Sequence, residues 1–183
     1  MRTLRATIVL GVVLGTVAAS VAMAGGDDRH KGKTKKATAT LVDGAGKRVG
    51  KVTLLQFRGK ITVAGRVKGV APGFHGFHVH AVGKCEGPAF TTAGGHFAAP
   101  GQNHGAHAGD LPSLLVNADG TASAAFETDR FTLAQLRDAD GSALIVHAGP
   151  DNFANIPPRY GTPDAETLAT GDSGARVACG VVR

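Results

Sequence analysis

The sequence of 183 residues has no tryptophan, one tyrosine and only two cysteines. Stretches with the 3.6-residue period of an amphipathic helix are few, whereas glycine occurs 27 times. A chain of this length has room for one domain with a proper core and hardly for two. These features exclude a helical bundle and favour one all-β domain with many turns.

Several motifs of other protein classes are also missing. The chain has no C-x-x-C thiol motif, no phosphate-binding loop and no internal repeat. It also lacks a Ser/His/Asp arrangement typical of a hydrolase. Nucleophilic hydrolysis and nucleotide chemistry therefore do not compete for its functional residues.

One apolar run occurs near the start of the chain, at residues 6–22, behind a short basic head. The run is short for a membrane span, and Ala22-Met23-Ala24 has the form of a signal-peptide cleavage site. We therefore predict a signal peptide at residues 1–24, no transmembrane anchor after cleavage, and an exported protein. An uncleaved anchor is the alternative. No cysteine follows the run, which argues against lipid attachment there.

The formal net charge of +6 is unevenly distributed. Five basic residues fall within one short stretch, namely Arg29, Lys31, Lys33, Lys35 and Lys36, whereas residues 37–183 hold 13 basic and 12 acidic residues. We interpret residues 25–36 as a disordered, solvated leader and residues 37–183 as the folded domain, and we expect no nucleic-acid partner. Weak attachment of the leader to an anionic cell envelope is the alternative.

Short alternating segments separated by turn signals predict an antiparallel β-sandwich or barrel of about eight strands. Arg58-Gly59 and Ala118-Asp119-Gly120 predict tight turns of two hairpins, and Thr132-Leu133-Ala134-Gln135 has the form of a capping box. Two long segments, 81–111 and 148–173, have no strand pattern, and loops of such length are usually functional. The strands are expected at residues 38–42, 49–57, 61–67, 74–80, 114–117, 122–126, 143–147 and 175–182.

Histidines cluster in the sequence, with six between residues 75 and 107. His78 and His80 lie two apart in a predicted strand, so both imidazoles face the same side. His96 and His147 supply a third and a fourth nitrogen donor, and an all-imidazole set suits copper or zinc. His75 lies on the opposite strand face from His78, and we interpret it as structural.

A second group of donors follows in the 81–111 loop. His104, His107 and Asp110 recur at three-residue spacing with small residues between them, a compact set for tetrahedral zinc. The alternative is a flexible histidine-rich surface loop that binds metal loosely or not at all. Outside the cytosol, Cys85 and Cys179 are expected to form one disulfide that closes a loop of nearly a hundred residues.

These motifs together resemble those of the copper–zinc superoxide dismutase family. They occur in the same order as in the family, over residues 37–183. The resemblance implies a Greek-key β-sandwich and the disproportionation of superoxide to oxygen and hydrogen peroxide. The stretch that starts at His147 is closest to exported bacterial members. The matching segments are Gly73-Phe74-His75-Gly76-Phe77-His78-Val79-His80, Gly94-Gly95-His96-Phe97, His107-Ala108-Gly109-Asp110-Leu111, Val146-His147 and Gly174-Ala175-Arg176-Val177-Ala178-Cys179-Gly180.

The resemblance also implies a role for each site residue. Copper ligands would be His78, His80, His96 and His147, and zinc ligands would be His96, His104, His107 and Asp110. His96 would bridge the two metals and act as the acid–base group, and Arg176 would guide the superoxide anion to the copper. Asp151 would link copper and zinc ligands through hydrogen bonds, and Cys85 and Cys179 would form the family's disulfide.

One departure from the family pattern concerns zinc. Only two residues separate His104 from His107, where the family usually has a longer insertion. We therefore expect zinc to be held more weakly than copper, and a copper-only enzyme stays open. A non-enzymatic exported copper-binding or copper-delivery protein is the alternative function. The sequence leaves open the final compartment (periplasm, cell wall or medium) and whether the protein is a monomer or a homodimer.

Overall fold

The structure is a computed structural model, and it describes residues 33–183. The predicted signal peptide and most of the predicted leader lie outside these residues. Among the described residues, no helix has the length and hydropathy of a membrane span. The strands are β1 (Lys35–Asp43), β2 (Arg48–Phe57), β3 (Lys60–Lys68), β4 (Gly73–His75), β5 (Phe77–His80), β6 (Leu114–Val116), β7 (Thr121–Thr128), β8 (Ala143–His147) and β9 (Arg176–Val181). They are joined by η1 (Thr91–Ala93), η2 (Gln135–Arg137), η3 (Pro158–Tyr160) and α1 (Ala165–Thr170).

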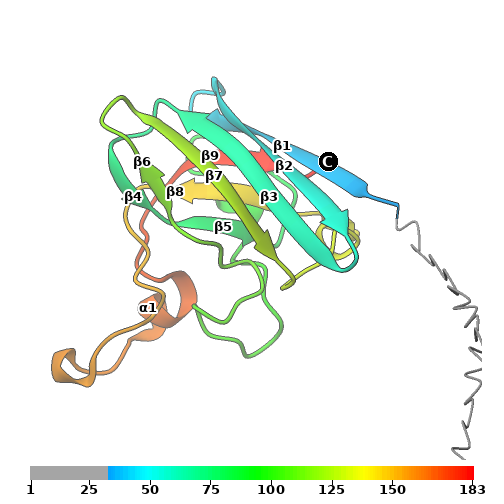
Figure 1. Ribbon diagram of the computed structural model, residues 1–183. Helices are drawn as coiled ribbons and strands as arrows, with labels where there is room; N and C mark the ends of the chain where they lie inside the picture. The colour runs from blue at the N-terminus through cyan, green and yellow to red at the C-terminus, as the bar shows by residue number, and fades with distance from the viewer. Residues whose placement is uncertain (1–32) are drawn as a thin grey trace, which may run out of the picture. The chain divides into compact units, whose positions relative to one another are not determined.

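Seven strands form one curled antiparallel sheet in the order β5-β8-β9-β1-β2-β3-β7, and β4 pairs with β6 in a second small sheet. In Figure 1, β3 and β7 cross in front of β8 and β9, so the curled sheet folds over itself into two layers. The order departs from the sequence order because long connections carry the chain between the layers. The prediction of an all-β antiparallel sandwich is confirmed.

The core lies between the two layers, because alternate residues of each strand point inward. Leu41 of β1, Leu54 of β2 and Val63 of β3 pack in the same buried cluster as Val79 of β5 and Leu144 of β8. A second, smaller cluster covers the other face of β8 and includes Phe90, Ala93, Ala143, Ile145 and Cys179. Strand β8 is therefore buried on both faces, by the core and by the 81–111 loop.

The strand predicted at residues 74–80 is interrupted at Gly76. Residues before Gly76 pair with β6, whereas those after it pair with β8. Gly76 exchanges backbone hydrogen bonds with Gly149 (2.9 Å) and His147 (2.8 Å), and a Cβ at this position would lie 2.6 Å from Cβ of Ser173. This crowding is a tertiary effect, which is why a continuous strand was a wrong prediction here.

The two predicted hairpins have different outcomes. Arg58 and Gly59 both have positive φ, as a two-residue turn between paired strands requires, and β2 pairs with β3 from Gly50 to Phe57. The second turn also closes, with the amide of Asn117 bonded to the carbonyl of Thr121 (2.8 Å). The strands that it joins then diverge, however: β6 pairs with β4, and β7 pairs with β3. The second hairpin prediction was therefore wrong.

Two local features complete the description of the sheet ends. Thr132 and Gln135 form the predicted capping box, with the amide of each bonded to the side chain of the other at 2.8 and 3.3 Å. Strand β1 starts at Lys35, so the last two residues of the predicted leader belong to the sheet. Their pairing is reinforced by Arg137, whose Nη2 donates to the carbonyl of Lys36 at 2.9 Å.

Candidate metal centre

Three histidines are placed by β-strands. Phe77 and Val79 of β5 pack in the core, so His78 and His80 point to the opposite face of the same strand. Strand β8 pairs with β5 and ends at His147. All three imidazoles are nearly fully buried, because the two long loops cover this face.

The 81–111 loop runs back along β5 and is held there by backbone hydrogen bonds. The amide of Val79 donates to the carbonyl of Gly109 (2.9 Å), and its carbonyl accepts from the amide of Phe97 (2.8 Å). Gly109 is required at this contact, because a Cβ there would collide with the carbonyl oxygen of Val79. This docking places His96 beside His80 and Asp110 beside His78.

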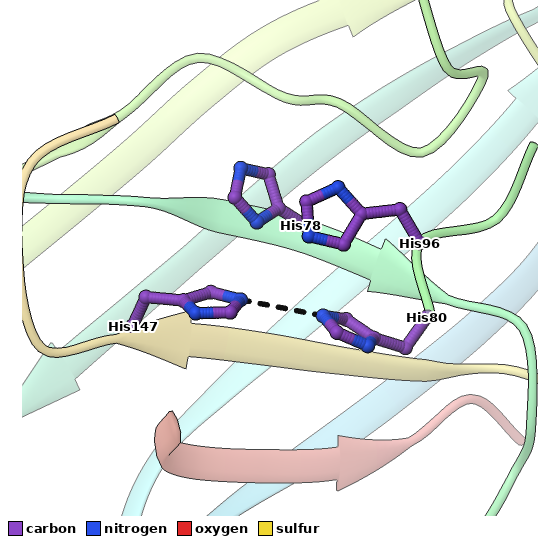
Figure 2. Close-up of side chains that lie close together, drawn as sticks. All are labelled: His78, His80, His96 and His147. Carbon is purple, nitrogen blue, oxygen red and sulfur yellow. Dashed lines mark hydrogen bonds between the residues drawn. The ribbon is translucent and has the colours of Figure 1, made fainter. Parts of the chain in front are cut away.

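The first donor group, here called the imidazole cluster, consists of His78, His80, His96 and His147. One ring nitrogen of each lies within 4.8 Å of the others. Figure 2 shows the four rings turned towards one another from β5, β8 and the loop, with Nε2 of His80 3.3 Å from Nε2 of His147. Nδ1 of His78 and Nε2 of His96 are buried without a hydrogen-bond partner. Buried nitrogens that converge and lack a hydrogen-bond partner fit a metal such as copper.

The second nitrogen of two of these rings is fixed by the backbone. Nδ1 of His80 donates to the carbonyl of Gly94, and Nδ1 of His147 donates to the carbonyl of Gly174, both at 2.9 Å. Because a neutral imidazole carries one proton, these bonds leave Nε2 of both rings free as a lone-pair donor to a metal. Such bonds orient metal ligands and set their tautomer.

The second donor group, here called the mixed cluster, consists of His96, His104, His107 and Asp110. Oδ1 of Asp110 lies 3.0, 3.1 and 3.3 Å from Nδ1 of His96, His104 and His107. Nδ1 of His96 lies 3.2 and 3.4 Å from Nδ1 of His104 and His107. Donors at zinc–ligand distances around a tetrahedral ion are about 3.3 Å apart. The short segment therefore brings its donors round one point, with a spacing that fits zinc.

His96 belongs to both clusters. Its Nδ1 faces Asp110 and its Nε2 faces the imidazole cluster without a partner. Donor atoms of His78 also lie within 4.8 Å of those of His96, His104 and Asp110. We assign His107 rather than His78 to the mixed cluster because Nδ1 of His107 lies 3.3 Å from Oδ1 of Asp110 and 3.4 Å from Nδ1 of His96.

Asp151 links the clusters from behind. Its Oδ2 accepts from Nε2 of His78 and its Oδ1 from Nε2 of His104, both at 2.7 Å. The structure thus brings Asp151 to the position that the resemblance implied. Gly171 caps α1 with φ of 62°, and a Cβ there would collide with both Asp151 and His104. The helix end therefore closes tightly over this hydrogen-bonded link.

Burial keeps three rings of the imidazole cluster neutral, those of His80, His96 and His147. Loss of hydration lowers the pKa of His80 to about 2, of His147 to about 3 and of His96 to about 4, against an ordinary value of 6.5. The positive charge of Arg176 and the neighbouring histidines lower the pKa of His80 and His147 further. Neutral imidazoles are the form that binds a metal, so no deprotonation is needed at neutral pH.

In the mixed cluster, carboxylates raise the pKa of a histidine instead of lowering it. Burial alone would lower the pKa of His104, but hydrogen bonds to Asp110 and Asp151 outweigh burial and raise it to about 9. Burial likewise acts to raise the pKa of Asp110 and Asp151, and the histidine hydrogen bonds hold both pKa values well below 3.8. In the absence of metal, His104 is therefore a cation between two carboxylates, a charge pattern that a divalent ion can replace.

Arg176 lies at the start of β9 and is held by two carbonyl groups. Its Nη1 donates to Phe90 and its Nη2 to Gly94, both at 2.6 Å. Gly94 also accepts from His80, so the guanidinium and this imidazole share an acceptor. Partial burial lowers the pKa of Arg176 from 12.5. A cation is thus fixed next to the imidazole cluster, where the resemblance places one.

Cys85 and Cys179 form a disulfide with a Cα–Cα separation of 5.6 Å, as predicted. The bond ties the start of the 81–111 loop to β9, the strand that also carries Arg176. His75 has the structural role that we expected. Its ring nitrogens hydrogen-bond to the carbonyl oxygens of His147 (2.7 Å) and Ala71 (2.8 Å).

Sequence reasoning missed Arg130, which supports the mixed cluster from outside. Its Nη1 and Nη2 donate to the carbonyls of Asp110 (3.1 Å) and Gly105 (3.0 Å). Inside the turn, Oδ2 of Asp110 accepts from the amides of Gly105 (2.7 Å) and His107 (3.0 Å). The guanidinium therefore clamps the ends of the donor segment. No local pattern in the sequence signals a contact between residues 20 and 25 positions apart.

The chain also matches known proteins. The model of the family described as copper/zinc superoxide dismutase matches residues 48–182. "Superoxide dismutase [Cu-Zn]" of Mycobacterium tuberculosis is 44% identical over 177 residues, covering 86% of this chain and 74% of that protein. "Extracellular superoxide dismutase [Cu-Zn]" of Brugia pahangi is 35% identical over 156 residues, covering 82% and 76%.

Among solved structures, a "SOD-like protein from Bacillus subtilis" superposes with a TM-score of 0.67 at 30% sequence identity, covering 79% of this chain and 96% of that chain. The family match extends over β2 to β9 and includes every donor of both clusters. Sequence and fold agree, and the chain belongs to the copper/zinc superoxide dismutase family.

Proposed function

We propose that this chain disproportionates superoxide to oxygen and hydrogen peroxide, with copper in the imidazole cluster and zinc in the mixed cluster. The observation that carries the proposal is the pair of clusters that share His96, within a chain of the copper/zinc superoxide dismutase family. Copper, when bound, supplies the one-electron chemistry, taking an electron from one superoxide and returning it to another. The side chains hold the metals, position the anion and move protons.

His96 is the proposed acid–base group. Its Nε2 is the nitrogen that faces the imidazole cluster, and it is buried without a hydrogen-bond partner, so a proton taken up at this atom is available to a molecule that enters the cluster. One proton would pass from Nε2 to the departing peroxide, and the second proton of hydrogen peroxide would come from water. Nδ1 stays in the mixed cluster beside Asp110, so the ring keeps its orientation while the proton moves.

Arg176 is the proposed guide for the substrate. Superoxide is a small anion, and a fixed cation beside the copper ligands raises its local concentration. Because two carbonyls hold the guanidinium, Arg176 is already oriented before the anion arrives. Asp151 would fix the orientation of one proposed ligand of each metal, His78 for copper and His104 for zinc, through its two hydrogen bonds.

We further propose that the protein works outside the cytosol. The predicted signal peptide and the disulfide Cys85–Cys179 support this, since disulfides persist in oxidising compartments. The related protein of Brugia pahangi is called extracellular. Cell fractionation with a tagged chain tests this part: recovery of an uncleaved, reduced protein in the cytosol would contradict it.

Arg176 variants, together with metal analysis, test the enzyme against a copper-delivery protein. We expect about one copper per chain in every variant and a superoxide rate that falls roughly tenfold or more in Arg176→Ala. Arg176→Glu should fall further, whereas Arg176→Lys should keep much of the rate. Added salt should slow the unmodified protein more than Arg176→Ala. If all four proteins bind copper alike and consume superoxide no faster than free copper, the delivery function replaces the enzyme.

A further inference from the structure

The domain is almost neutral only because two oppositely charged parts cancel. Residues 44–85 contain eight basic residues and no acidic one, whereas residues 86–183 contain five basic and eleven acidic residues. The basic part, residues 44–85, comprises β2 to β5. The acidic part, residues 86–183, contains the four donors of the mixed cluster. Such segregation is a feature of the folded domain, separate from the basic leader.

Part of the basic half lines a hollow of about 1090 Å³ on the outer face of β2, β3 and β7. None of these strands carries a donor of either cluster. The floor consists mostly of small residues, including Gly50, Thr53, Ala64, Ser123 and Ala125. Long cationic side chains line it as well, and all four are exposed: Arg48, Lys51, Arg66 and Lys68.

Two of these cations face each other across the sheet. Lys51 of β2 is directly paired with Arg66 of β3, an arrangement that destabilises an antiparallel sheet when both side chains carry the same charge. Among residues 33–183, no carboxylate lies within ion-pair distance of either side chain, and none lines the hollow. An anion bound between them would relieve this repulsion.

The lining narrows the chemistry of that anion. No aromatic side chain lies in the hollow, so it offers neither the anchors of a typical protein interface nor platforms on which nucleobases stack. Arginine and lysine side chains bind phosphate oxygens well, and the hydroxyls of Thr53 and Ser123 add neutral donors on the floor. The open shape suits a chain that passes through rather than an enclosed small molecule.

We propose that this basic hollow binds the phosphate groups of a linear phosphodiester polymer of the kind found in cell envelopes. The polymer would lie across β2, β3 and β7, with neighbouring phosphates contacting the pair Lys51–Arg66 and the flanking cations Arg48 and Lys68. The bound protein would keep its metal clusters away from the polymer, since they are built on other strands.

Binding of fluorescent poly(glycerol phosphate) to the purified protein tests the proposal. Lys51→Gln/Arg66→Gln should bind at least tenfold more weakly at low salt, and the slope of log affinity against log salt should fall by roughly one to two. The matched control Lys84→Gln/Arg159→Gln removes the same charges from exposed positions outside the sheet, and its affinity should stay within about twofold of that of the unmodified protein. The superoxide rate should be the same in both variants, which separates this test from that of the enzyme.

Three competitors identify the ligand, and a leader variant locates the site. We expect polyglutamate, heparin and a thymidine oligonucleotide, matched for charge, to bind no tighter than poly(glycerol phosphate). Arg29→Gln/Lys31→Gln/Lys33→Gln should still bind through the hollow. The proposal is overturned if the leader variant loses all binding, if the control weakens binding as much as Lys51→Gln/Arg66→Gln, or if no binding occurs at low salt. Tighter binding of polyglutamate or heparin would replace the phosphodiester polymer with that class of ligand, and tighter binding of the oligonucleotide would replace the envelope polymer with a nucleic acid.

Discussion

Three of the four donors in the imidazole cluster sit on or at the end of paired β-strands, whereas every donor of the mixed cluster lies on the 81–111 loop. His78, His80 and His147 are positioned by the same hydrogen-bonded ladder that builds the core. His104, His107 and Asp110 depend on contacts that arrive from elsewhere, such as those of Arg130 and Asp151. Strands supply a rigid frame for the imidazole cluster, and contacts between loops supply one for the mixed cluster.

Removing one donor from each region gives the largest expected difference. His80→Gln should lose copper and reduce the superoxide rate by more than about a hundredfold, since even partners of metal ligands are worth 10- to 100-fold in affinity. His107→Gln should lose zinc while keeping copper and at least about a tenth of the rate. Metal content and superoxide consumption measure both. Loss of copper from His107→Gln as complete as from His80→Gln would abolish the distinction.

The disulfide should matter for both regions, because it ties the loop to the sheet. Cys179→Ser should lower the free energy of unfolding by about 2–5 kcal/mol, measured by denaturant titration, and Cys85→Ser should reproduce the loss. Zinc should be released more readily than copper from both variants, because the loop carries all donors of the mixed cluster. Two freely titrating thiols in the native protein would remove this support from the argument.

Asp151→Asn should weaken zinc binding by roughly 10- to 100-fold and copper binding less. The carboxylate accepts from His78 and His104 through separate oxygens, and an amide replaces one of these oxygens with an NH2 group, which cannot accept. His104 lies in a loop, whereas His78 is held in β5, so the loss of a hydrogen bond should displace His104 more than His78. Competition with a chelator measures both affinities, and an unchanged zinc affinity would rule out a positioning role for Asp151.

The two regions should respond to pH in opposite directions in the metal-free protein. Folding lowers the pKa values of His80 and His147 to about 2 and about 3. As the pH falls below 6.5, both residues therefore become protonated in the unfolded chain but stay neutral in the folded protein. Stability should therefore fall as the pH drops below about 6.5. The pKa of His104 is raised to about 9, so the stability that it contributes is complete below 6.5 and is lost as the pH rises towards 9.

Thermal melts of the chelated protein between pH 4 and about 9.5 measure both slopes. His80→Gln should flatten the acid side, and His104→Gln should flatten the alkaline side. The carboxylates act in the same acid direction, but only below about 4, because their pKa values are lowered from 3.8. A melting temperature that does not change between pH 6 and 9 would contradict the charge state assigned to His104.

Substitution of Arg130 should have the smallest effect of these changes, and only zinc binding should be weakened. Arg130→Gln removes the clamp on Gly105 and Asp110 and should weaken zinc binding by a few-fold, on the scale of two lost surface hydrogen bonds. The matched control Arg137→Gln removes the same charge and a bond to Lys36, and it should leave zinc unchanged. Equal losses in both variants would assign the effect to net charge.

Strand periodicity was a good guide to the imidazole cluster. Alternation placed His78 and His80 on one face of their strand, and the residue types showed that the donors are imidazoles. The apolar run before His147 located β8. The same pattern failed at Gly76 and between β6 and β7, where the chain changes sheets because of packing with distant residues. The spacing of His104, His107 and Asp110 indicated zinc, but it did not reveal how so short a segment keeps its geometry.

The sequence by itself indicated the candidate donors and the β-class of the fold, because residue chemistry and strand alternation are local properties, and with only two cysteines in the chain one disulfide pairing was possible. Only the tertiary structure decided that the ring of His96 faces both clusters, that Asp151 joins ligands of each, and that Arg130 supports the loop. Those contacts connect residues between 14 and 73 positions apart. Their geometry depends on how the curled sheet brings its loops together, which no local pattern encodes.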